Sequence, residues 1–94
     1  MYIINLTYIK PTEEVDRVLP KHIKFLDKYY SNNKFICSGR KNPRIGGIIL
    51  CNPDSIDEIK SIISEDPFNI EKVANYDIIE FQPTKCSPDF KSFI

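Results

Sequence analysis

The chain has 94 residues, enough for one domain with a single hydrophobic core and too few for two. Hydrophobic residues make up 41% and charged residues 28%, which is typical of a globular domain and not of a disordered chain. Thirteen basic and thirteen acidic residues cancel, so no net positive field attracts nucleic acid or anionic lipid, and neither is expected as a partner.

The first predicted element is a strand over residues 2–9, where side chains alternate between two partly apolar faces. A proline ends this strand, and the acidic segment after it predicts one short helical turn. Pro20 interrupts any longer helix, so we expect a new helix from Pro20 to about Tyr30. This prediction places His22, the only histidine, in the first turn of that helix.

Two further strands are predicted over residues 35–38 and 48–51, where short apolar runs occur. The most basic short stretch of the chain, residues 40–44, lies between them and leads to Gly46 and Gly47. Paired glycines indicate a turn. The two strands are therefore expected to form a hairpin.

A second helix is predicted by a capping box, in which Ser55 is followed three residues later by Glu58. Isoleucines with helical spacing follow, and Pro67 stops the helix because proline disfavours the α conformation in the residue before it. Asp66 should therefore leave the helix at an exposed corner. Phe68 then returns the chain to the core.

The remainder is predicted to be a loop over residues 69–75, whose apolar residues pack lightly, and a last strand over residues 76–81. We divide the chain into one domain, residues 1–83, and a C-terminal tail, residues 84–94. Two phenylalanines in the tail suggest that it docks onto its own subunit or onto a neighbour.

The predicted order is strand, helix, strand, strand, helix, strand, which is the order of a ferredoxin-like βαββαβ sandwich. The fold class is thus α+β, with a four-stranded antiparallel sheet and two helices on one face. The other sheet face carries alternate apolar positions and needs a cover. We expect a second copy of the chain to pack against it and form a homodimer.

In this topology the ends of several segments meet at one edge of the domain, where a small molecule can enter between helices and sheet. The candidate catalytic pair is His22 and Asp66. The candidate substrate-binding residues are Ser38, Tyr8, Arg40 and Arg44.

Metal and disulfide chemistry is not indicated, because the three cysteines show no C-x-x-C spacing and the chain has one histidine. Cys37 and Cys51 lie in apolar runs and are expected to be small buried hydrophobes, with a nucleophilic role as the alternative for Cys37. The first residues lack the features of a signal peptide, and no apolar run is long enough to span a membrane. A cytoplasmic location and no membrane partner are expected.

Three short motifs carry a resemblance to a known family. They are the HIKFL segment at residues 22–26, the Cys-Ser-Gly strand end at residues 37–39, and the Glu-Asp-Pro-Phe segment at residues 65–68 before a strand that contains Tyr76. With these motifs the chain resembles the YciI-like, or YCII-related, family, to about Phe81. The H-x-x-F-L pattern alone is weak and D-P-F alone is moderate, but their order and spacing together are fairly specific.

The resemblance implies a dimeric α/β-barrel arrangement of ferredoxin-like subunits and an active site formed by His22 and Asp66. Some relatives act in dehalogenating or lactone-rearranging steps of aromatic degradation, which need proton transfer and no metal or organic cofactor. The resemblance therefore implies a cofactor-independent lyase, isomerase or dehalogenase acting on a small carboxylated substrate. The alternative is a non-catalytic module of the same fold that binds a small metabolite or serves as an accessory subunit.

Each candidate residue also has a structural interpretation. His22 would cap a helix or face solvent, and Asp66 would end a helix in an Asp-Pro turn. Tyr8 would pack in the core or an interface, Ser38 would finish a strand, and the arginines of the basic loop would be solvated. If His22 and Asp66 do pair, the helix N-terminus disfavours the imidazolium and the carboxylate favours it.

Overall fold

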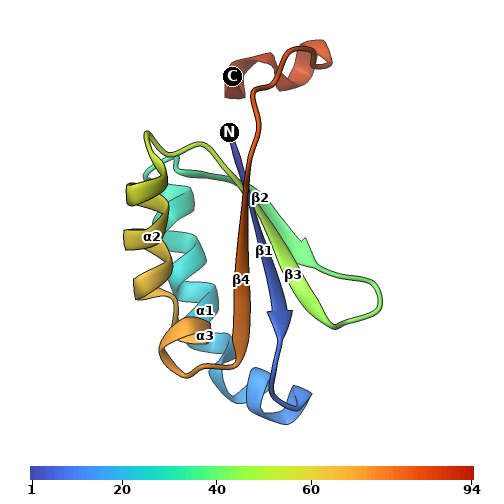
Figure 1. Cartoon of the computed structure of the whole chain (residues 1–94), viewed down its shortest axis with the longest axis vertical. Coiled ribbons are helices and arrows are strands. Elements are labelled where there is room, and N and C mark those ends of the chain that lie inside the picture. The colour runs from blue at the N-terminus through green and yellow to red at the C-terminus, as the bar shows by residue number, and fades with distance from the viewer.

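The computed structural model describes all residues from Met1 to Ile94. The strands form one antiparallel sheet in the order β2-β3-β1-β4, and α1 and α2 cover one of its faces (Figure 1). This arrangement confirms the predicted ferredoxin-like sandwich. The elements are β1 (Tyr2–Tyr8), α1 (Thr12–Ser31), β2 (Phe35–Arg40), β3 (Gly46–Cys51), α2 (Ile56–Glu65), α3 (Pro67–Ile70), β4 (Ala74–Glu80) and the 3-10 helix η1 (Pro88–Phe93).

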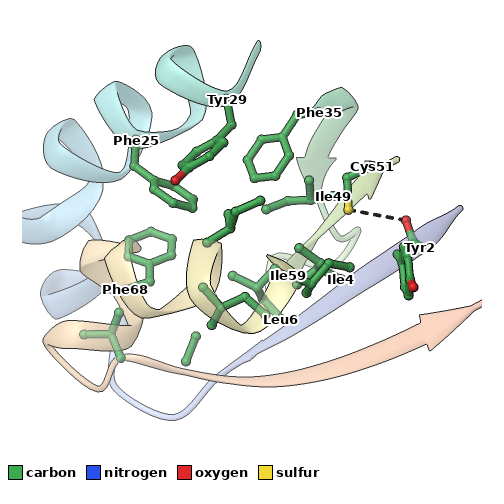
Figure 2. Close-up of a cluster of buried hydrophobic side chains, with 14 of the residues drawn as sticks. Tyr2, Ile4, Leu6, Phe25, Tyr29, Phe35, Ile49, Cys51, Ile59 and Phe68 are labelled. Carbon is green, nitrogen blue, oxygen red and sulfur yellow. Dashed lines mark hydrogen bonds between the residues drawn. The ribbon is translucent and has the colours of Figure 1, made fainter. Parts of the chain in front are cut away.

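The core lies between the sheet and the helices, where side chains from β1, β3, α1, α2 and α3 meet (Figure 2). The central strand β1 supplies every second residue to it, namely Tyr2, Ile4 and Leu6, because side chains alternate along a strand. The residues between them point to the opposite face of the sheet, which no helix covers. We call this opposite face the outer face.

Helix α1 runs unbroken from Thr12 to Ser31, so the prediction of a new helix at Pro20 is wrong. The buried residues of α1 recur every three or four positions on both sides of the proline, so one apolar stripe follows the whole helix. Pro20 itself is exposed, where water can satisfy the Asp16 carbonyl that has lost its N–H partner. His22 therefore lies in the middle of α1, and the helix N-terminus does not act on it.

The Ser55 half of the capping box of α2 is confirmed, since the Glu58 amide donates to Ser55 Oγ at 3.1 Å. The Glu58 carboxylate accepts from the Asp54 amide at 3.3 Å, one residue before the cap. The helix ends at Glu65, as Pro67 predicts, but the expected exposed position of Asp66 is wrong. Asp66 is fully buried. Its side chain accepts from the Phe68 amide at 3.0 Å and caps the short helix α3. Helix α3 packs against α1 and covers Asp66.

The segment predicted as a loop instead contains the second half of α3 and the start of β4. Lys72 has a positive φ of 56°, which turns the chain from α3 into β4. Val73 and Ala74 are 1% and 5% exposed, so they are core residues and do not pack lightly. The Val73 amide donates to the Phe68 carbonyl at 2.9 Å and holds this turn against α3.

The two strand cysteines differ from each other in burial. Cys51 is fully buried, as expected, whereas Cys37 is exposed and the prediction for it is wrong. The register of β2 shifts between Phe35 and Cys37, and Cys37 then lies opposite Leu50, whose neighbour in the next strand is Ile3. The thiol therefore belongs to the uncovered outer face.

The tail leaves β4 and extends beyond the end of the sheet (Figure 1). Phe90 and Phe93 pack on each other with ring centroids 5.2 Å apart, and Asn52 Nδ2 donates to the Phe93 carbonyl at 3.0 Å. The tail thus contacts its own subunit. The division at residue 83 stays a prediction. None of the helices has the length and apolarity needed to cross a bilayer.

Candidate active site

A cavity of about 150 Å³ lies between α1 and the sheet. Its floor comes from β1, β2 and β3, and its wall comes from α1 and from Phe68 of α3. Eight of its thirteen lining residues are hydrophobic, and none is an aspartate or glutamate. Four of the predicted site residues line it: His22, Ser38, Tyr8 and Arg40.

His22 and Asp66 lie together at the wall of this cavity. His22 Nδ1 is 2.7 Å from Asp66 Oδ1, and both residues are buried. Only His22 lines the cavity, because Asp66 sits behind the ring. A ligand would therefore meet the imidazole and not the carboxylate.

Aromatic packing fixes the orientation of the imidazole. The His22 ring stacks on Phe68 with ring centroids 3.9 Å apart and an angle of 6° between the ring planes. The ring centroid of Phe25, one turn along α1, lies 5.9 Å from the centroid of the His22 ring. Each residue of the D-P-F motif thus contributes to holding His22. Asp66 binds one nitrogen of its ring, Pro67 starts α3, and Phe68 of α3 stacks on its face.

The contact with Asp66 determines what the two ring nitrogens of His22 can do. A nitrogen that faces a carboxylate carries the proton, so in the neutral ring Nδ1 donates and Nε2 is the acceptor. Nε2 has no hydrogen-bond partner in the protein and is not fully buried. The residue that lines the cavity thus carries one acceptor without a partner.

Sequence reasoning missed Tyr76, whose Oη donates to Asp66 Oδ2 at 2.5 Å. Burial, with the adjacent carboxylate, raises the pKa of Tyr76, so the phenol stays a donor. The alternation of β4 predicts which face of the sheet a residue points to, but not that its hydroxyl meets Asp66. The only sequence signal was the position of this tyrosine shortly after the D-P-F motif.

The polar residues at the sheet side of the cavity come from β2. Ser38 Oγ accepts from Tyr30 Oη at 2.6 Å, and Arg40 is exposed and forms no ion pair. Arg44 is not brought to the cavity. It pairs with Asp16 at 2.5 Å, a contact that raises the pKa of its guanidinium.

The fold and this geometry define a class of protein, an α+β sandwich with a buried His–Asp pair at the wall of a small cavity. The family model for the YCII-related domain matches residues 1–82, and the chain belongs to this family. No curated protein matches the sequence.

One solved structure with a similar fold is 5-chloro-2-hydroxyhydroquinone dehydrochlorinase from Burkholderia phenoliruptrix, in complex with 2,5-dihydroxybenzoquinone. The TM-score is 0.67 and the sequence identity is 16%. The similarity covers 87% of this chain and 94% of that chain. At this identity it supports the fold assignment alone.

Proposed function

We propose that the protein is a cofactor-independent acid/base enzyme of the lyase, isomerase or dehalogenase type, in which His22 transfers a proton on a small carboxylated substrate. One observation carries this proposal: His22 lines a cavity, its Nδ1 is held by buried Asp66 at 2.7 Å, and its Nε2 has no hydrogen-bond partner in the protein. A side chain held in one orientation beside a charged partner suits proton transfer.

The proposed chemistry begins when Nε2 takes a proton from a carbon or oxygen of the substrate, whose bonding electrons stay behind as an anion. The imidazolium that forms lies beside the buried Asp66 carboxylate, which stabilises the new charge. In an isomerisation, Nε2 returns the proton to another atom. In a lyase or dehalogenase reaction, the substrate anion instead expels a leaving group with its electron pair.

The size and charge of the cavity limit the proposed substrate. An apolar cavity of roughly 150 Å³ holds a molecule about the size of benzene. Arg40 is the only permanently charged lining residue, and it has no carboxylate partner within the protein. The site therefore fits a compact, largely apolar body with one anionic group near β2. The dehydrochlorinase of similar fold also binds a single-ring ligand, which supports this size class.

The test of this function combines a substrate panel with variants at the cavity. Small carboxylic acids, halogenated ring acids and lactones are screened for turnover, and His22→Ala should lower kcat by about 10²–10⁴-fold. Arg40→Gln should mainly raise KM. Arg44→Gln is the matched control and should leave KM unchanged, because this arginine belongs to the same basic stretch but pairs with Asp16 outside the cavity.

Two outcomes would contradict the enzyme proposal. If His22→Ala weakened ligand binding while wild-type protein turned over no member of the panel, the non-catalytic binding module would be the better account. If His22→Ala turned over a substrate as fast as wild type, another group would carry the proton. NMR spectra of His22→Ala with and without ligand separate the first case from misfolding, because a folded variant keeps the dispersed signals of wild type.

A further inference from the structure

Tyr76 makes a contact at the site that the proposed function does not use. It lies on β4 opposite core residue Leu6, on the strand face that points to the helices, and donates to Asp66 Oδ2 at 2.5 Å. The other carboxylate oxygen, Oδ1, accepts from His22 Nδ1 and from the Phe68 amide. Tyr76 is therefore the sole donor to Oδ2 within the protein.

Asp66 is buried without a lysine or arginine beside it. A buried carboxylate without a permanent cation depends on hydrogen bonds to remain charged. The titratable groups that face it are His22 from α1 and Tyr76 from β4, while α3 contributes the Phe68 amide and α2 no side chain. The proton affinity of the pair thus depends on the phenol.

We infer that Tyr76 is a positioning residue that lowers the proton affinity of the His22–Asp66 pair and so keeps His22 Nε2 free to act as a base. The phenol withdraws negative charge from the carboxylate, and a less negative carboxylate stabilises an imidazolium less. Without the phenol, the pair would hold an added proton to higher pH. The inference rests on the proposed function for its catalytic meaning, but its test needs no substrate.

Because His22 is the only histidine, protein labelled with ¹⁵N-histidine gives one pair of ring signals to follow against pH. In Tyr76→Phe the midpoint of this titration should rise by about one pH unit. Nδ1 should still carry the proton of the neutral ring. In Asp66→Asn the midpoint should move downward, because an amide does not stabilise the imidazolium. Tyr29→Phe is the matched control, since that phenol donates to a different carboxylate, Glu65, and its loss should leave the titration unchanged.

If the titration midpoint of His22 in Tyr76→Phe were the same as in wild type, the inference would be overturned. If Asp66→Asn also left the titration unchanged, the His–Asp contact itself would fail, and the proposed function with it. If Tyr76→Phe does not fold, 3-fluorotyrosine at this position keeps the hydroxyl as a stronger donor. It should move the midpoint of the His22 titration to lower pH. An unchanged midpoint would contradict the inference. With a substrate in hand, the acid limb of kcat/KM in Tyr76→Phe should move upward like the titration, with KM little changed.

Discussion

Gly46 occupies a place in β3 where no side chain fits. A Cβ built at this position would overlap the Leu6 carbonyl oxygen of β1, and the neighbouring Cα of Thr7 lies close as well. The obstacle is backbone of the central strand, which cannot move without disturbing both of its pairings. The glycine pair at residues 46 and 47 is thus strand structure and not the turn that its composition indicates.

We therefore expect Gly46→Ala to lower the free energy of unfolding by about 3 kcal/mol or more, as overpacking at a rigid position does. Urea denaturation followed by circular dichroism measures the change. Gly39→Ala is the matched control, because a Cβ there meets nothing within 4 Å, and it should be neutral or slightly stabilising. Equal effects of the two substitutions would show that the close approach to β1 is unimportant.

At the scale of elements, α1 shows how tertiary packing overrides a local rule. Proline in a helix interior removes one backbone hydrogen bond and crowds the preceding turn, which is why the sequence predicts a break. The break does not occur because residues on both sides of Pro20 bury the same stripe against the sheet and α3. Helix α1 gains more from that continuous burial than it loses at one exposed residue.

This account predicts that Pro20→Ala stabilises the fold by about 1–3 kcal/mol, since it restores the lost hydrogen bond without touching the core. Thermal and urea unfolding would show the gain. Lys24→Ala, at another exposed position of the same helix, is the control and should change stability by less than about 0.5 kcal/mol. A loss of stability in Pro20→Ala would mean that the proline shapes α1 in a way its neighbours require.

How much the sequence predicts depends on whether a feature is local. The capping box of Ser55 and the strand alternations depend on near neighbours, so the element order and the sheet follow from them. The burial of Asp66 depends on α3 docking against α1, which no nearby residue indicates. The bond from Tyr76 to Asp66 likewise joins groups ten positions apart across two elements, so only the structure supplies it.

For the molecule as a whole, the outer face of the sheet is the large surface without a cover. Ile3 pairs in register with Leu50 on one side and Ile79 on the other, so an apolar row crosses three strands. Beside this row, Asn5 Oδ1 is buried and has no hydrogen-bond partner. A second copy packed on this face would cover the apolar row and remove it from water.

We therefore expect the protein to form a homodimer through the outer face, and Ile79→Lys to break it because a charge there would be buried without a partner. Ile79 is 51% exposed in one copy, so the substitution should spare the fold. Ile70→Lys is the control, since Ile70 is 61% exposed on α3, away from the sheet. Sedimentation velocity from micromolar to millimolar protein should show a dimer for wild type and Ile70→Lys, and a monomer for Ile79→Lys. A wild-type monomer across this range, or a dimer that survives Ile79→Lys, would contradict the outer face as the interface.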